Sequence, residues 1–307
     1  LIIIYGSRNA ETLTNKMSRR EDKYMICESI NIHEDMDKIK SEILRFDGAI
    51  ICDITGQTRN DIIKYCFENS KRIYISPKIS DIIIRGGTDI NLFDSPLLLC
   101  RNSGLSFEQR LFKRIFDIVV SVIGLIILSP FMLIIAAAIK IDDGGSIIYK
   151  QKRLTINGKE FFVYKFRSMI PNAEKNGVPQ LATGSDSRIT RVGKFLRKCR
   201  LDELPQLFNI IKGDMSVVGP RPERPELTEK YEREMPEFKF RLKVKAGLTG
   251  YAQVTGVYDT TPYDKLKMDL MYIERYSMVM DLRIILMTIK TMISPGEMNS
   301  EADKEKY

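Results

Sequence analysis

Short apolar runs alternate with amphipathic stretches over the first hundred residues. Short continuous apolar runs between turn residues are typical of strands that are covered on both faces. The expected strands are Leu1–Tyr5, Tyr24–Ile32, Ala49–Ile54 and Arg72–Ile75. The segments between them have helical spacing, near 10–20 and over Met36–Phe46 and Arg59–Asn69. This alternation predicts an α/β fold, with a parallel, Rossmann-like sheet in residues 1–100.

The first turn of this region carries Gly6 but no GxGxxG pattern, so the dinucleotide-binding fingerprint is absent. A structural or regulatory module is therefore favoured over nucleotide binding. Sensing, simple packing and oligomerisation, for instance in a homodimer, all remain open roles for residues 1–100. The chain starts at Leu1 inside an apolar run, and we expect upstream sequence.

A long apolar run follows the polar connector at 101–112. Ile115–Ile139 contains one charge, Asp117, and Ile118–Ile139 contains none over 22 residues. That length can span a hydrocarbon layer of ~30 Å. Its mid-chain position excludes a signal or transit peptide.

Ser129-Pro130 lies near the middle of the run. Proline removes a helical hydrogen bond and clashes with the preceding turn, so we expect a helix break there. Basic residues flank both ends of the run, which places both ends on the same side of a membrane. Together these features predict a re-entrant helix-break-helix over residues 113–141. A spanning helix with a tolerated kink and a buried core helix are the alternatives.

Residues 142–295 have the pattern of a mostly helical α+β domain, followed by a polar tail at 296–307. Asn157-Gly158 predicts a hairpin between strands Ser146–Lys152 and Glu160–Phe166. Helix is expected over most of Val192–Lys212, and an irregular rigid loop over Gly213–Glu226. Later segments read as a turn at 247–250 and helices at 227–234, 262–276 and 281–292.

The net charge of +8 is concentrated in one block. Residues 1–100 carry 14 basic and 15 acidic side chains, whereas residues 140–200 carry 14 basic and 5 acidic ones, a net +9. A local basic block predicts a local anionic partner, which could be phosphate, nucleic acid or an anionic membrane surface. The single histidine, His33, and cysteines without CxxC spacing argue against a His-rich metal site or a zinc ribbon.

Asp202-Glu203 follows a group of basic residues and precedes Pro205. Adjacent residues of a regular helix point about 100° apart, but at a helix start or before a break both carboxylates can line one pocket. One carboxylate could then attack while its neighbour binds a divalent cation. A chain with one histidine can still perform that chemistry. The alternative is a solvated acidic pair.

Cationic side chains recur in rigid contexts. Arg221 lies between Pro220 and Pro222, and Lys165 and Arg167 are two residues apart on one face of an expected strand. Guanidinium groups present planar donors that match phosphate oxygens. Combined with the carboxylate pair and the apolar run, they predict phosphate chemistry at a membrane surface.

Several motifs occur in a fixed order from Lys113 to about Met292. They are Lys113-Arg-Ile-Phe-Asp117, Ser129-Pro130, Tyr149–Arg153, Lys165–Met169, Leu201–Leu207, Lys212–Ser216, Gly219–Pro222 and Gly247–Gly250. In this order the chain resembles the bacterial sugar transferases, the monotopic polyprenyl-phosphate phosphoglycosyl transferases that act as undecaprenyl-phosphate sugar phosphotransferases. Residues 1–100 resemble the nucleotide-binding-like domain of longer members.

The resemblance implies a role for each matched position. Asp202 would attack the diphosphate of a UDP-sugar and form an aspartyl-phosphosugar intermediate, which undecaprenyl phosphate would then accept. Glu203, with Asp202, would hold Mg²⁺, and Ser129-Pro130 would produce the membrane break. The expected phosphate-binding residues are Arg197, Arg221, Lys165 and Arg167.

The resemblance also implies a place and a purpose. The reaction would be the first membrane step of exopolysaccharide, capsule or O-antigen assembly. It would occur at the bacterial inner (cytoplasmic) membrane, with the active site on the cytoplasmic face and in contact with membrane lipid. Rival interpretations are an inactive membrane-bound scaffold and a basic nucleic-acid-binding protein. No nucleic-acid partner is expected, because the basic block abuts the apolar run and no nucleic-acid-binding module is recognisable. The sugar is left open.

Overall fold

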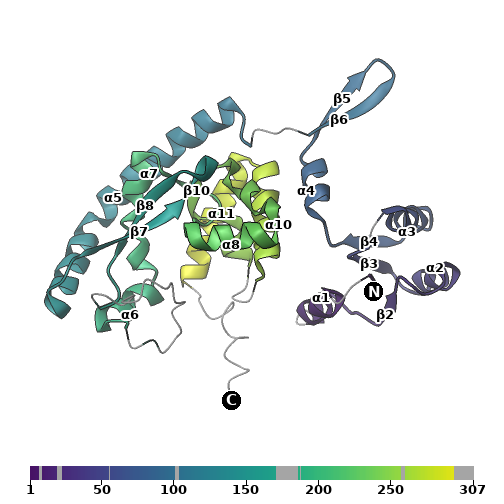
Figure 1. The fold of residues 1–307 in the computed structure, drawn as a ribbon, viewed down its shortest axis with the longest axis horizontal. Coiled ribbons are helices and arrows are strands. Elements are labelled where there is room, and N and C mark those ends of the chain that lie inside the picture. Colours follow the sequence, from purple (N-terminus) through teal and green to yellow (C-terminus); the bar gives the residue numbers. More distant parts are fainter. Residues whose placement is uncertain are drawn as a thin grey trace. The chain divides into compact units, whose positions relative to one another are not determined.

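The computed structural model describes residues 1–6, 9–18, 23–54, 56–100, 104–170, 186, 188–256 and 260–293 (Figure 1). The chain forms two compact units, Leu1–Asp81 and Ile82–Tyr307, whereas the sequence predicted a boundary near residue 100. The expected tail at 296–307 lies outside the described residues.

The first unit holds a four-stranded parallel sheet in the order β2-β1-β3-β4. The strands are β1 (Ile2–Tyr5), β2 (Glu28–Asn31), β3 (Gly48–Cys52) and β4 (Arg72–Ile75). The helices are α1 (Asn9–Ser18), α2 (Met36–Arg45), α3 (Gly56–Glu68) and α4 (Ile79–Arg85), the last of which runs across the boundary between the units. The mixed α/β class with a parallel sheet is thus confirmed.

Side-chain alternation along β1 divides the core of this unit in two. Ile2 and Ile4 pack with Ile39 of α2 and Ile62 of α3, whereas Ile3 faces the opposite side and packs with Leu13 of α1. Successive strand residues point to opposite faces, so one apolar strand can bury both faces under helices.

A hairpin that the sequence analysis did not anticipate follows α4. Strands β5 (Thr88–Leu92) and β6 (Ser95–Leu99) pair antiparallel, and all ten of their residues are exposed. Because neither face contributes to a core, no alternation of apolar and polar residues marks these strands.

The long apolar run lies in a single helix, α5 (Phe107–Asp143), of 37 residues. It begins inside the connector expected at 101–112. Ser106 Oγ accepts a hydrogen bond from the Gln109 backbone N–H, and the Gln109 side chain accepts one from the Ser106 N–H. This reciprocal capping box starts the helix, and Ser-x-x-Gln was the signal for it in the sequence.

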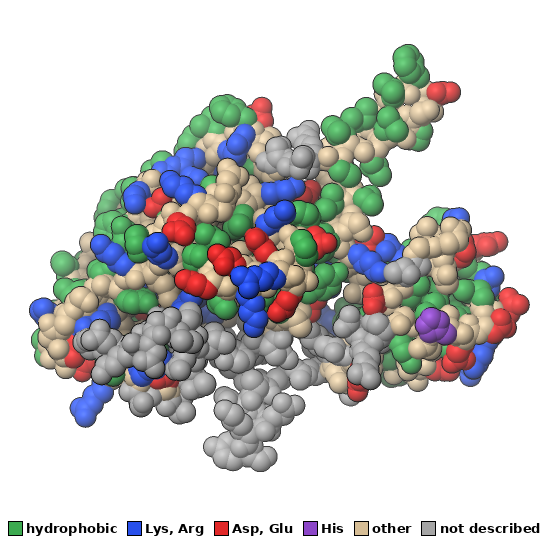
Figure 2. Space-filling view, viewed as in Figure 1, with side chains coloured by type: hydrophobic (Ala, Val, Ile, Leu, Met, Phe, Trp, Pro, Cys, Tyr) green, Lys and Arg blue, Asp and Glu red, His purple; other side chains and the backbone are tan. Residues whose placement is uncertain are grey.

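Helix α5 buries polar side chains and exposes apolar ones, the reverse of a helix that packs on the core of a water-soluble protein. Lys113, Asp117 and Ser121, spaced by four, are buried against the protein. The exposed side chains are apolar, and Figure 2 shows them along the outer edge of this helix. They include Ile115, Ile118, Val119, Val122, Ile123, Ile126, Ile127, Phe131, Leu133 and Ile134. Within the described residues, α5 is the helix that is long and apolar enough to cross a membrane. With family membership, established below, this indicates a membrane-associated protein.

The break expected at Ser129-Pro130 is not confirmed, because α5 runs through Pro130 without interruption. A proline at 130 has no N–H to donate to the carbonyl four residues earlier, that of Ile126. The Ser129 hydroxyl donates to this carbonyl instead, at 3.0 Å. The serine therefore satisfies the acceptor that the proline leaves free, and the helix continues.

The remainder of the second unit packs against α5. The predicted hairpin is confirmed as β7 (Ile148–Leu154) and β8 (Glu160–Phe166), which pair antiparallel. The other helices are α6 (Arg191–Lys198), α7 (Gln206–Lys212), α8 (Pro225–Glu234), α9 (Tyr251–Thr255), α10 (Pro262–Glu274) and α11 (Met278–Ile293). Short 3₁₀ turns lie at Ile156–Gly158, Leu201–Glu203 and Pro236–Lys243.

The expectation of mostly helix over Val192–Lys212 is confirmed, although the helix is interrupted: α6 ends at Lys198, and Arg200 has a φ of 55°, outside the right-handed helical region. The expectation of a loop and a turn without strands is wrong. The segments expected as a loop and a turn contain a parallel strand pair, β9 (Met215–Val218) and β10 (Ala246–Thr249). These strands are short and almost wholly buried, so they lack the alternation that marks a half-buried strand.

The Ser129 contact gives a testable expectation. Ser129→Ala leaves the Ile126 carbonyl without a donor, which should cost about 1 kcal/mol and lower the melting temperature in detergent micelles by about 2–4 °C. In a Pro130→Ala background, residue 130 regains an N–H and the same serine substitution should have little effect. An equal loss in both backgrounds would contradict the compensating role of the hydroxyl.

Candidate active site

The carboxylate pair lies in a single 3₁₀ turn, Leu201–Glu203, between α6 and α7. The left-handed Arg200 precedes the turn, and Pro205 follows it at the start of α7. This interruption of the helix presents Asp202 and Glu203 together, as the sequence analysis anticipated for a break. Both side chains are partly buried.

Glu203 is held by two cations from distant parts of the chain. Its Oε1 accepts hydrogen bonds from Lys165 Nζ at 2.7 Å and from Arg221 Nη2 at 3.1 Å. Burial raises the pKa of the Glu203 carboxyl, but the charges of Arg221 and Lys165 outweigh burial and lower it to about 2. Glu203 is therefore ionised at every physiological pH.

The pKa of Asp202 is shifted in the opposite direction. Burial raises the pKa of its carboxyl above the usual range, Lys165 partly opposes this, and the negative charge of Glu203 adds to it. Arg197 also opposes the rise. Neighbouring carboxyls whose pKa values are pushed apart are typical of sites where the two groups have different tasks.

Arg197 reaches this group from α6, while Arg167 does not join it. Arg197 Nε donates to Ser168 Oγ at 2.9 Å, and its charge acts on Asp202. The backbone pairing of the hairpin continues to Arg167, whose N–H donates to the Ile147 carbonyl at 2.9 Å. The Arg167 guanidinium pairs instead with Asp143, at the end of α5. The structure thus brings together Asp202, Glu203, Lys165, Arg197 and Arg221.

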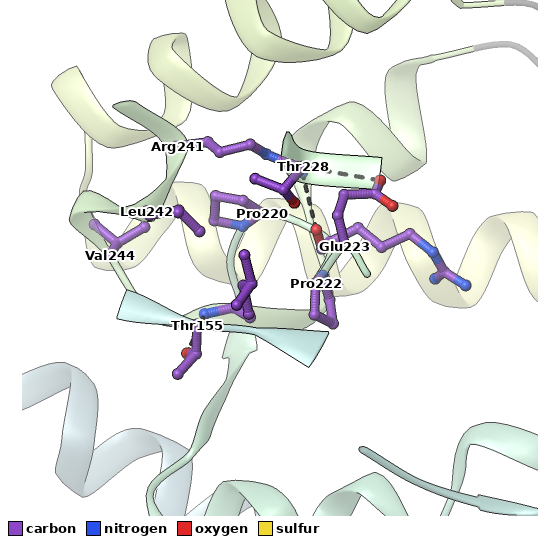
Figure 3. Close-up of a pocket in the computed structure, with 11 residues that line it drawn as sticks. Thr155, Pro220, Pro222, Glu223, Thr228, Arg241, Leu242 and Val244 are labelled. Carbon is purple, nitrogen blue, oxygen red and sulfur yellow. Dashed lines mark hydrogen bonds and ion pairs between the residues drawn. The ribbon is translucent and has the colours of Figure 1, made fainter. Parts of the chain in front are cut away.

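The loop that carries Arg221 follows β9 and is fixed through its carbonyl oxygens. Two of its residues are prolines, which have no N–H to donate. Four consecutive carbonyls each accept a hydrogen bond, namely Pro220 from Gly247 N–H (2.9 Å), Arg221 from Arg241 Nη2 (2.9 Å), Pro222 from Arg153 Nη1 (3.1 Å) and Glu223 from Leu154 N–H (3.0 Å). Figure 3 shows the small pocket behind this loop, with Arg241 reaching toward Glu223.

The sequence analysis did not single out Arg241. Asp269 matched a family position, but no role could be assigned from sequence to Asp269 or to Arg153. Arg241 is 4% exposed and Asp269 1% exposed. No local signal distinguished Arg241, because Lys239, like Arg241, lies between two apolar residues and yet is exposed. That pattern does not reveal the partner, which is 28 residues further along the chain.

The donor set fits a divalent cation that is shared with a substrate. Among the described residues no group of three or more His, Cys, Asp or Glu side chains could hold a metal alone. Mg²⁺ is usually bound by one or two carboxylates together with substrate phosphates and water. Asp202 and Glu203 supply two carboxylates, and only Oε1 of Glu203 is engaged by Lys165 and Arg221.

Comparison with known proteins shows which family the chain matches. The model of the family described as bacterial sugar transferase matches residues 108–295. A protein of Aeromonas hydrophila named UDP-N-acetylgalactosamine-undecaprenyl-phosphate N-acetylgalactosaminephosphotransferase is 42% identical over 59% of this chain and 44% of its own length. A UDP-glucose:undecaprenyl-phosphate glucose-1-phosphate transferase of Klebsiella pneumoniae is 43% identical over 67% of this chain and 43% of its own length.

A shorter relative is aligned over nearly its whole length. The exopolysaccharide production protein PSS of Rhizobium leguminosarum bv. phaseoli is 40% identical over 60% of this chain and 96% of its own length. By contrast, the chain spans less than half the length of the two relatives named above. The family match includes α5, the turn with Asp202 and Glu203, and the Arg221 loop, and the chain belongs to the bacterial sugar transferase family.

Proposed function

We propose that the protein transfers a phosphosugar from a UDP-sugar to undecaprenyl phosphate through a covalent intermediate on Asp202. The observation that carries the proposal is the pair of adjacent carboxylates with opposite pKa shifts among three cations. The names of the relatives, which pair UDP-sugars with undecaprenyl phosphate, support the substrate class. Exopolysaccharide assembly is the process that the Rhizobium relative's name supports.

The first step is an in-line substitution at phosphorus. A carboxylate oxygen of Asp202 attacks the sugar-bearing phosphorus of the donor, and a P–O bond forms. The bond from that phosphorus to the bridging oxygen breaks, and UMP leaves with the electron pair. Arg221, Arg197 and Lys165 lie where they can neutralise donor phosphates that would otherwise repel the carboxylate.

The second step regenerates the enzyme. A phosphate oxygen of undecaprenyl phosphate attacks the same phosphorus, and the bond from phosphorus to Asp202 breaks. The products are the free carboxylate and an undecaprenyl diphosphate sugar. Because UMP has departed, a water-soluble donor and a lipid acceptor can use one site in turn.

Glu203 and Asp202 would hold Mg²⁺, which when bound supplies positive charge to the diphosphate. Glu203 suits this role because its low pKa keeps it ionised. Lys165 and Arg221 keep one of its oxygens in place.

We further propose that the protein attaches to the cytoplasmic face of the bacterial inner membrane. Near its start α5 is bonded to α11 through Lys113 and Asp281, and near its end Ile139 packs with Leu196 of α6. Both ends of the helix therefore contact the same compact unit. This favours a helix that lies in one leaflet with its apolar face toward lipid over one that crosses the bilayer, and it needs no break at Pro130.

The proposed function is tested by a donor screen. The protein with undecaprenyl phosphate and Mg²⁺ should release UMP from at least one of UDP-glucose, UDP-galactose and UDP-N-acetylgalactosamine. Asp202→Asn removes the nucleophile and should lower the rate at least about 1000-fold. Glu160→Gln, a matched change at an exposed carboxylate, should leave the rate unchanged. Release of UMP at the wild-type rate by Asp202→Asn would overturn the mechanism, and an absence of release from any donor would overturn the proposed activity.

The pH dependence of kcat/KM should report the ionisation of the Asp202 carboxyl. Only the ionised carboxylate attacks, so kcat/KM should fall as the pH decreases through the pKa of Asp202, which burial raises above its usual value. Lys165→Met removes a cation that lowers this pKa and should move the acid limb to higher pH. Lys152→Met, which removes an equal charge from an exposed ion pair with Glu160, should not move it. An acid limb at the same pH in all three proteins would exclude Asp202 as the titrating group.

Metal removal gives a separate test. EDTA should abolish UMP release, and added Mg²⁺ should restore it, since the described carboxylates form a partial donor set that is completed by substrate. Glu203→Gln should raise the Mg²⁺ concentration needed for half-maximal rate. A rate that is unaffected by the chelator would show that the arginine and lysine side chains neutralise the donor phosphates without a metal ion.

A further inference from the structure

The Arg221 loop cannot be held by its own backbone donors at two positions, because residues 220 and 222 are prolines. Its position depends on donors that come from outside the loop. Two of these are side chains, Arg241 and Arg153. The side chain of Arg221 is 48% exposed and is hydrogen-bonded to Glu203, so contacts with its backbone are a second restraint on where its guanidinium can point.

Arg241 joins the loop to a buried carboxylate. Its Nη2 donates to the Arg221 carbonyl at 2.9 Å and lies 2.8 Å from Asp269 Oδ2, and its Nε donates to the same Oδ2 at 3.0 Å. Its Nη1 lies 3.7 Å from Glu223 Oε1, and the guanidinium carbon lies 4.9 Å from the centre of the Phe238 ring. Figure 3 shows Arg241 linked to Glu223.

The orientation of Arg241 is strongly constrained. Both Arg241 and Asp269 are almost completely buried, and an unpaired charge at either position would be costly. Burial raises the pKa of the Asp269 carboxyl, and the charge of Arg241 and its hydrogen bond oppose this rise. A planar guanidinium can direct one edge at Asp269 and still donate to a carbonyl, whereas a lysine ammonium has no such fixed geometry.

We propose that Arg241, oriented by Asp269, is a positioning residue that fixes the backbone of Arg221 so that the Arg221 guanidinium faces Glu203 and the donor phosphates. The proposal rests on the proposed function. The line of contacts runs from Asp269 through Arg241 to the Arg221 carbonyl, and from the Arg221 guanidinium to Glu203 Oε1. Arg241 itself is buried behind the loop and acts through Arg221.

A double-mutant cycle separates positioning from general stability. Using the full chain in detergent micelles with the active UDP-sugar and undecaprenyl phosphate, Arg241→Lys should lower kcat/KM about 10- to 100-fold, because small misplacements of a catalytic group have effects of this size. In an Arg221→Ala background the same substitution should change kcat/KM less than about twofold. Equal losses in the two backgrounds would overturn the proposal.

Arg59→Lys provides the matched control. Arg59 on α3 is likewise an arginine paired with an aspartate, since its Nη1 and Nη2 lie 2.9 and 2.8 Å from the carboxylate of Asp81, but this pair belongs to the first unit. Any loss caused by Arg59→Lys should be the same with and without Arg221. If Arg241→Lys does not fold, as judged by thermal melting, the isosteric Asp269→Asn is used in the same cycle, with the same two outcomes.

A binding measurement keeps this inference distinct from the proposed function. By titration calorimetry with UDP, Arg241→Lys should weaken binding when Arg221 is present and leave it unchanged in the Arg221→Ala background. If the wild type released no UMP from any donor, the proposed reaction would fail, while coupling between Arg241 and Arg221 in UDP binding would still support the positioning role of Arg241. If the wild type turned over and the Arg241 and Arg221 substitutions had additive effects in both assays, only the positioning role would be overturned.

Discussion

Buried polar groups on a membrane-type helix determine how the second unit is assembled. Lys113 and Asp117 lie on α5, whose exposed face is apolar, and neither can be buried without partners. Lys113 Nζ lies 2.6 Å from Asp281 Oδ2, and Asp117 Oδ1 accepts hydrogen bonds from Ser216 Oγ and the Val217 N–H. These contacts attach α5 to α11 and to β9, whose chain continues directly into the Arg221 loop.

Strand β9 therefore connects α5 to the candidate active site. Tyr272 strengthens this junction, since its hydroxyl donates to Asp281 Oδ1 at 2.8 Å and lies 3.2 Å from the carbonyl of Val218, the last residue of β9. The next residues form the loop whose carbonyls are held by Arg241 and Arg153. A helix with its apolar face in lipid would thus hold Arg221, the proposed phosphate-binding residue, at a fixed depth relative to the membrane surface.

The sequence was sufficient to predict the elements that have a regular pattern of apolar and turn residues. The parallel sheet of the first unit and the β7–β8 hairpin follow from apolar runs and from the Asn157-Gly158 turn. The carboxylate pair and its basic neighbours were also visible, but the sequence did not reveal that Arg167 pairs with Asp143, at the end of α5. An ion pair between segments that are distant in the chain leaves no local signal.

Other features depend on contacts between residues that are distant in sequence. Ser216 makes β9 appear polar, yet it is buried because Asp117, 99 residues earlier, accepts its hydrogen bond. The Arg241–Asp269 pair likewise joins two segments whose separate patterns do not identify each other. At Ser129-Pro130 the proline rule predicted a break, and the compensation depends on one serine rotamer that a composition rule does not include.

The different roles proposed for Asp202 and Glu203 follow from their surroundings. Glu203 accepts bonds from two cations at one oxygen and has a pKa of about 2, so its oxygens are weakly basic and poorly suited to attack. Asp202 has a raised pKa and is the more basic carboxylate. Basicity favours Asp202 as the nucleophile, and permanent ionisation favours Glu203 as a cation ligand. Burial is the main cause of the raised pKa of Asp202, and the negative charge of Glu203 adds to it while Lys165 opposes it. Lys165 and Arg221 lower the pKa of Glu203 and so keep that negative charge in place.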